Sequence, residues 1–315
     1  GGIVIYIILR ALGEMTVDNP NPGSFSEYAY TYIGKYAGFI SGWSAWFEYT
    51  VVCMVELTAV TVFFDYFVPG IPHWILCAFI LVFFTAINLV NVKVFGEFEF
   101  WFAGIKVLTI IIMLLFSAYL IIFKHGTNPD VGQYGNPSLF FAGGYKGFAI
   151  SLVIVVFSFG GSEFVSIAAG EAENPRKNIP IAINGVIVRV LLFYVLTMLV
   201  IILLYPYQKL STQISPFVDV FKKMGFSMAA DIMNMVAITA ALSTFNSCLY
   251  AASRMLFNLS DNGFAPKYLS NIQAGNHIPR KATLFTAAAI VIAVIINYLF
   301  DFALTGLSSF IHLFS

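Results

Sequence analysis

The sequence predicts an all-α polytopic membrane protein. Of its 315 residues, 59% are hydrophobic and only 10% are charged, and the mean hydropathy is +0.86. Soluble globular proteins do not have this composition. The apolar residues also gather into runs of about 20, which is the length a helix needs to cross a bilayer. Because the formal net charge is zero, no basic surface for nucleic acid is expected.

The apolar runs follow one another along the chain as seven complete spans and two partial ones. We place them at 1–12 (partial), 37–64, 74–92, 100–123, 147–170, 181–205, 229–257, 282–299 and 302–315 (partial). Polar, glycine- or proline-containing stretches separate most of them and predict surface loops. The chain starts without a methionine or a signal-peptide pattern and stops inside an apolar run. We therefore expect a fragment that lacks both ends.

Lysine and arginine are shared unequally between the two sets of alternate connections. One set, which includes Arg10, Lys35 and Lys177, carries nine of them, and the other carries five. Cytoplasmic loops carry the excess of basic residues in membrane proteins. We therefore expect the connections with nine to face the cytoplasm.

One span, within 147–180, has the pattern of a helix that is broken in the middle. Apolar residues run to Phe159, but Gly160 and Gly161 follow side by side and Glu163 comes two positions later. Each glycine weakens a helix by roughly 1 kcal/mol, and a carboxylate at that depth costs about 2.5 kcal/mol or more. A broken helix is tolerated only where it faces protein or a water-filled cavity. The alternative is that the glycines merely allow a neighbouring helix to approach closely.

Charged and polar side chains inside the spans are functional candidates, because charge that faces lipid is expensive. The ionisable ones are Glu48, Glu56, Lys106, Glu163 and Arg189. A structural role remains open for Glu48, Glu56 and Arg189, and the Lys106 stem has the length to reach the headgroups. A polar band at Ser243, Thr244, Asn246 and Ser247 either bonds neighbouring helices or lines a path for ions or substrate.

Five stretches of the chain resemble the amino acid transporter family of the amino acid-polyamine-organocation superfamily. They are LRALGEMTV (9–17), MVELTAVTVFFDYFVPGIP (54–72), FGEFEFWFAGIKVLTII (95–111), FSFGGSEFVSIAAGEAENPRKNIPIAI (157–183) and SRMLFNLSDNGFAPKYL (253–269). They occur in family order across nearly the whole chain.

The resemblance implies an inverted-repeat transporter fold of five plus five helices, with a discontinuous helix six. On that map residues 1–315 are a single, truncated transmembrane domain that lacks helix one and the C-terminal helices. Residues 1–123 are a partial first repeat and residues 147–315 the second repeat. The broken span corresponds to helix six.

The resemblance also implies a substrate site at the broken helix. Phe157 matches the aromatic residue that closes over the substrate, and Phe159, Gly160 and Gly161 match the unwound segment. Their backbone carbonyls are expected to accept hydrogen bonds from the substrate α-ammonium group. The neighbouring Ser158 and Ser162 complete the expected binding segment, and Glu56 is expected to face the same site.

Four further residues are implied in proton coupling. Glu163 matches an acidic position implicated in proton sensing. Lys106 matches a lysine that stands near the place of a sodium ion in sodium-coupled cousins, and Ser243 and Thr244 align with hydroxyl ligands of that ion. A protonated lysine there would replace the cation.

Together these observations predict a multi-pass protein of the plasma or bacterial inner membrane that imports amino acids by proton symport and alternating access. An amino acid exchanger of the same fold is the main alternative, and a channel or receptor is a further one. The sequence has no His-Glu-x-x-His motif and no Ser/His/Asp arrangement, so an enzyme is not expected. The expected partners are an amino acid and the lipid bilayer, with the proton as coupling ion and no metal or other cofactor. A neutral or aromatic amino acid, or proline, is the expected substrate.

Overall fold

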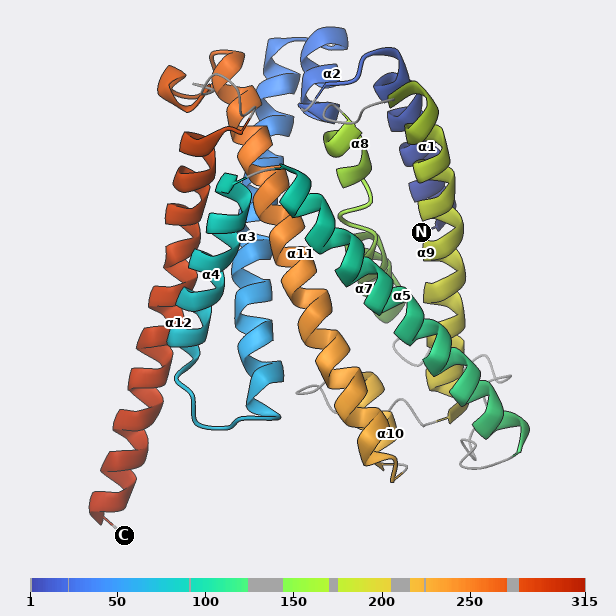
Figure 1. Ribbon diagram of the computed structural model, residues 1–315, viewed down its shortest axis with the longest axis vertical. Helices are drawn as coiled ribbons and strands as arrows, with labels where there is room; N and C mark the ends of the chain where they lie inside the picture. The colour runs from blue at the N-terminus through green and yellow to red at the C-terminus, as the bar shows by residue number, and fades with distance from the viewer. Residues whose placement is uncertain are drawn as a thin grey trace. The chain divides into compact units, whose positions relative to one another are not determined.

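The computed structural model describes residues 2–21, 23–90, 92–123, 144–169, 175–204, 216–223, 225–270 and 278–314. Every regular element in these ranges is a helix (Figure 1). They are α1 (Gly2–Asp18), α2 (Ser24–Tyr32), α3 (Lys35–Asp65), α4 (His73–Val90), α5 (Val92–Ile122), α7 (Gly144–Ser158), α8 (Phe164–Ala169), α9 (Pro175–Leu204), α10 (Pro216–Lys223), α11 (Ser227–Asp261), the 3₁₀ turn η3 (Lys267–Ser270) and α12 (Arg280–Phe314).

Several of these helices are long and apolar enough to cross a membrane. Among the described residues there are five, at Lys35–Asp65, His73–Val90, Gly96–Ile122, Ser227–Asp261 and Arg280–Asp301. Each matches a span expected from hydropathy. Shorter apolar helices lie at Gly144–Val155 and Leu192–Leu204. The expectation of an all-α polytopic membrane protein is therefore confirmed.

The division of the C-terminal stretch into two spans, 282–299 and 302–315, is wrong. The structure has one helix there, α12, which continues from Arg280 to Phe314. The hydropathy falls at this point because of Asp301, whose carboxylate accepts a hydrogen bond from the backbone N–H of His73 at 2.8 Å. A polar side chain with a partner on α4 lowers hydropathy without ending the helix, and neither glycine nor proline stands beside it.

The chain forms two compact units, each built from two separate segments. The first unit comprises 1–20 and 104–236, and the second comprises 21–103 and 237–315. Helices α5 and α11 therefore contribute to both units.

In the first unit, α1 and α9 run side by side (Figure 1). Their core contains Leu9 from α1 and Ile179 and Ile183 from α9, all at most 5% exposed. Gly13 permits this close packing, because a Cβ atom at that position would lie 2.3 Å from the Ile183 Cδ1 atom. A larger residue at 13 would require the end of the Ile183 side chain to move.

In the second unit, α12 packs along α4 and α3 (Figure 1). The side chain of Asn297 on α12 donates a hydrogen bond to Thr58 Oγ1 on α3 at 3.0 Å. The Trp46 indole of α3 donates to Thr286 Oγ1 of α12 at 3.1 Å. Side-chain hydrogen bonds thus supplement van der Waals packing between these apolar helices, as is usual in membrane bundles.

Candidate functional site

The helical path is interrupted between α7 and α8. Helix α7 ends at Ser158, residues 159–163 form turns, and α8 begins at Phe164. Gly161 has a φ angle of +88°, which favours glycine because a Cβ atom is strained in that region. The interruption therefore lies where the two glycines follow one another in the sequence.

Most of the backbone carbonyls in this segment already accept short-range hydrogen bonds. The Phe159 carbonyl accepts the Ser162 hydroxyl at 2.8 Å, and the Gly161 carbonyl accepts the Phe164 N–H at 3.1 Å. The Glu163 carbonyl accepts the Ser166 N–H at 2.9 Å. The Phe159 and Glu163 carbonyls each accept a second bond at 3.4 Å, from the Ser162 and Ile167 N–H groups. Because a carbonyl oxygen has two lone pairs, the Gly161 carbonyl is the one of these three that retains capacity for a ligand.

Tyr194 of α9 supports the interruption from the side. Its hydroxyl donates to the Ser158 carbonyl at 2.7 Å, which satisfies a carbonyl at the open end of α7. Its ring also contacts Phe159, with ring centroids 5.5 Å apart, and Phe159 is 9% exposed. Sequence reasoning missed Tyr194. The sequence feature that could have identified it is a tyrosine inside an apolar run, where the hydroxyl group needs a hydrogen-bond partner.

Helix α8 is attached to α1 by two buried hydroxyl groups. Thr16 and Ser166 place their hydroxyl oxygens 2.5 Å apart, and both residues are at most 1% exposed. The Thr16 hydroxyl also lies 2.7 Å from the Leu12 carbonyl, to which it donates. The chain after the interruption is therefore held in a defined position.

The other expected residues of the first unit lie in different surroundings. Phe157 is on α7, but its side chain lies outside the described part of the structure. The Ser158 hydroxyl turns back to the Val155 carbonyl at 2.8 Å. Gly160 is exposed, and Glu163 is half-buried.

Lys106 lies on α5, fourteen residues after the start of that helix at Val92. It is half-buried.

A carboxylate network in the second unit surrounds the expected Ser243. Glu99 of α5 accepts hydrogen bonds from the Ser243 hydroxyl and from the Asn246 amide, both at 2.8 Å. Asn246 in turn accepts from the Asn88 amide of α4 at 2.9 Å. Thr244 takes no part in these bonds, and its hydroxyl donates to the Ala240 carbonyl of its own helix.

Sequence reasoning missed Glu99 because it placed this residue just outside the span at 100–123. In the structure Glu99 lies within α5, which begins at Val92. The sequence feature that could have identified it is an acidic residue flanked in the sequence by Phe98, Phe100 and Trp101.

The remaining acidic and basic candidates are placed as follows. Glu56 is half-buried on α3 and Glu48 is exposed on the same helix, while the side chain of Arg189 lies outside the described residues. Glu56, Ser243 and Thr244 belong to the second unit, whereas the 157–163 segment and Lys106 belong to the first. Within the described ranges, no group of three or more His, Cys, Asp or Glu side chains is arranged to hold a metal ion.

Comparison with known proteins identifies relatives over almost the whole chain. A family model described as amino acid permease matches residues 1–312. The aromatic amino acid transport protein AroP of Escherichia coli O6:H1 is 44% identical over 299 residues, which is 95% of this chain and 65% of AroP. AroP of Salmonella typhimurium strain LT2 is 44% identical over 300 residues, with the same coverage of both chains.

A third relative comes from Bacillus subtilis. The uncharacterized amino acid permease YtnA of Bacillus subtilis strain 168 is 42% identical over 300 residues, covering 94% of this chain and 65% of YtnA. The chain thus spans about two thirds of the length of these curated relatives. All three are named as transport proteins or permeases, which decides against the enzyme class. The chain belongs to the amino acid permease family, and its apolar helices make it a multi-pass protein of the cell membrane.

Proposed function

We propose that this protein is a secondary active transporter that imports amino acids by proton symport and alternating access. The observation that carries the proposal is the non-helical backbone of residues 159–163, between two helices of an apolar bundle. Irregular backbone at membrane depth is stable only against protein or a water-filled cavity. In transporters such discontinuous helices form the substrate site.

The C-terminal end of α7 has the polarity to bind an ammonium group. A helix carries partial negative charge at its C-terminus, and α7 ends at Ser158 beside the interruption. The exposed Gly160 is the residue whose carbonyl we assign to the substrate α-ammonium. Phe157, Phe159 and Ser162 flank it, and Glu56 is a further proposed substrate-binding residue.

The substrate we propose is an aromatic amino acid. Two of the relatives are named as aromatic amino acid transport proteins. The Phe159 and Tyr194 rings already contact one another at the interruption, and aromatic rings attract further rings in edge or offset geometry. A bound aromatic side chain would extend this pair.

Proton coupling is assigned to Lys106 and Glu163, with Ser243 and Thr244 at the corresponding ion position. The half-buried position of Lys106 within an apolar helix supports a functional amine, since an ionisable group inside a membrane span is costly. In the proposed cycle a proton and the amino acid bind from outside and are released inside when one part of the fold rocks against the other. The proposed architecture is the inverted repeat, with 1–123 and 147–315 as its two halves and α7 with α8 as its sixth helix.

The test is uptake of radiolabelled phenylalanine by proteoliposomes that contain the full-length protein, with and without an inward proton gradient. We expect accumulation that depends on the gradient and is lost in Lys106→Ala. The matched control is Lys35→Ala, because Lys35 is exposed at the start of α3. Uptake that ignores the gradient and requires internal amino acid would identify an exchanger instead.

A further inference from the structure

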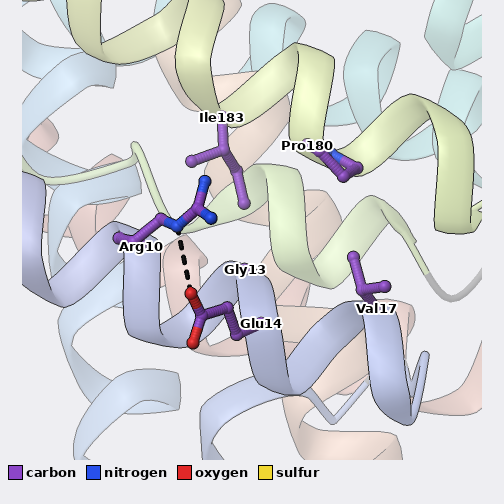
Figure 2. Close-up of a pocket in the computed structure, with 6 residues that line it drawn as sticks. All are labelled: Arg10, Gly13, Glu14, Val17, Pro180 and Ile183. Atoms are coloured by element: carbon purple, nitrogen blue, oxygen red, sulfur yellow. Dashed lines mark hydrogen bonds and ion pairs between the residues drawn. The ribbon is translucent and has the colours of Figure 1, made fainter.

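A pocket lies between α1 and α9, apart from the interruption between α7 and α8. Its volume is about 250 Å³. The residues that line it are Arg10, Gly13, Glu14, Val17, Pro180 and Ile183, all in the first unit (Figure 2). Pockets for drug-sized ligands measure about 300–1,000 Å³. This pocket is therefore suited to a smaller molecule.

The floor of the pocket is apolar, and part of it belongs to the buried core between α1 and α9. Val17, Pro180 and Ile183 supply hydrocarbon surface from both helices. Ile183 belongs to the buried core between α1 and α9 and is 5% exposed. The missing side chain at Gly13 lets the two helices meet closely at this floor.

The rim of the pocket carries one positive and one negative group. Arg10 and Glu14 are four residues apart, so they share one face of α1, and Arg10 Nε donates to Glu14 Oε1 at 3.1 Å. Their side chains are 52% and 69% exposed. Figure 2 shows the terminal nitrogens of Arg10 directed toward Ile183 and the Glu14 carboxylate on the same side of α1.

The two charged groups keep most of their hydrogen-bonding capacity. A guanidinium group has five N–H donors and a carboxylate has two oxygens. Within the described part of the chain, the pair uses one donor and one oxygen. An exposed ion pair of this kind contributes little free energy. A ligand that bonds to both partners therefore loses little by breaking it.

We propose that this pocket binds a small zwitterion, with its oxyanion on Arg10, its primary ammonium group on Glu14 and its apolar tail on Val17, Pro180 and Ile183. Charge-assisted hydrogen bonds to both charged ends give this chemistry its selectivity. Two sources carry it: a free amino acid with an apolar side chain, and the headgroup of phosphatidylethanolamine. The choice of an amino acid as the first probe rests on the proposed function. The predicted orientation of α1 places this site toward the cytoplasm, so it is distinct from uptake at the 157–163 segment.

Ligand protection of a cysteine introduced at Val17 tests this proposal in the full-length protein. Within the structure Cys53, Cys77 and Cys248 are all buried, and N-ethylmaleimide labelling of the protein without Val17→Cys gives the background that is subtracted. With L-phenylalanine at about ten times its dissociation constant, labelling should slow about tenfold, because mass action leaves roughly one site in ten empty. The matched control is Asp18→Cys, which is exposed at the next position and does not line the pocket.

Two ligands that each lack one charge decide whether both ends are recognised. Phenethylamine lacks the carboxylate, and 3-phenylpropionate lacks the ammonium group. We expect both to protect at least tenfold less well than phenylalanine. Equal protection by either ligand would overturn the proposal without any change to Arg10 or Glu14. So would the absence of protection both by phenylalanine and by phosphatidylethanolamine vesicles.

Substitutions at Arg10 and Glu14 test whether these two side chains hold the ligand. In the Val17→Cys background, Glu14→Gln and Arg10→Gln should each raise the phenylalanine concentration needed for protection about tenfold or more. Unchanged protection in both would also overturn the proposal. Protection that requires phosphatidylethanolamine vesicles, and is absent in phosphatidylcholine vesicles without amino acid, would identify the lipid headgroup as the zwitterion.

This readout does not depend on transport. If the protein fails to accumulate amino acids while phenylalanine protects Val17→Cys, the proposed function fails and the pocket assignment stands. If uptake is normal but neither phenylalanine nor phosphatidylethanolamine protects Val17→Cys, the pocket assignment alone fails.

Discussion

The two compact units accommodate polar groups within apolar helices in opposite ways. In the first unit the backbone itself is interrupted, between Ser158 and Phe164, and its carbonyls bond to neighbouring turns and to one tyrosine hydroxyl. In the second unit α4, α5 and α11 stay helical through their polar region, and side chains bond to one another around Glu99. The interrupted segment keeps backbone carbonyls that can accept further hydrogen bonds. In the network, both oxygens of the Glu99 carboxylate already have donors.

This contrast indicates different roles for the two regions. Backbone carbonyls that retain lone pairs are able to bind a substrate, and turn residues can change conformation at low cost. A side-chain network in an apolar environment is costly to open, because each group would lose its partner where no water replaces it. We therefore expect changes at Glu99 to affect chiefly stability, and changes in the 159–163 segment to affect transport.

The largest expected effect comes from removing the centre of the side-chain network. Glu99→Ala leaves the Ser243 hydroxyl and the Asn246 amide without their acceptor. We expect the free energy of unfolding to fall by about 2–4 kcal/mol, since bonds to charged groups are strong but membrane proteins recover part of their value. Unfolding of the full-length protein in detergent measures this. Glu97→Ala, at an exposed position two residues away, should change stability little, and equal losses in both variants would contradict the network.

Gly161→Ala tests the interrupted segment. A Cβ atom at φ +88° is strained, and we expect a cost of about 1–2 kcal/mol together with slower phenylalanine uptake. Gly147→Ala on α7 is the matched control, because a Cβ atom there meets no other atom within 4 Å. Undiminished uptake in Gly161→Ala would show that the turn conformation is not needed for transport.

Tyr194→Phe separates the hydroxyl of this residue from its ring. The change keeps the ring beside Phe159 and removes the hydrogen bond to the Ser158 carbonyl. We expect a loss of about 1 kcal/mol in unfolding free energy and a change in the apparent affinity for phenylalanine. The control is Tyr36→Phe, since Tyr36 is 86% exposed. If both variants behave alike, Tyr194 does not support the interruption.

The smallest effect is expected from Ser158→Ala. The Ser158 hydroxyl bonds to the carbonyl three residues earlier on its own helix, and Ser151 on α7 makes the same kind of bond. Both serine-to-alanine changes should therefore alter the free energy of unfolding by less than about 0.5 kcal/mol. A rise in KM for Ser158→Ala alone would show that its hydroxyl turns to the substrate.

Hydropathy predicted the apolar helices well, because lipid exposure demands long apolar runs whatever their packing. It failed at Asp301, where a charged side chain inside α12 resembled the end of a span. The partner that makes this residue tolerable is His73, more than two hundred positions away in the chain. No local pattern contains that information.

The candidate site shows the same limit. Gly160 and Gly161 indicated the position of an interruption by themselves, since their helix propensity is a local property. Tyr194 and Glu99 went unnoticed because their significance lies in the Ser158 carbonyl and in Asn246, which come from other helices. The inverted repeat and the roles of Lys106, Glu163 and Glu56 stay predictions.

The bond between Asp301 and the first turn of α4 has a mechanical consequence. A helix start that is capped by a side chain from a second helix loses this hydrogen-bond acceptor if the two helices slide past one another. With the Asn297 bond to Thr58 on α3 as well, α12 is bonded to both α3 and α4. We therefore expect these three helices to move together as one rigid group.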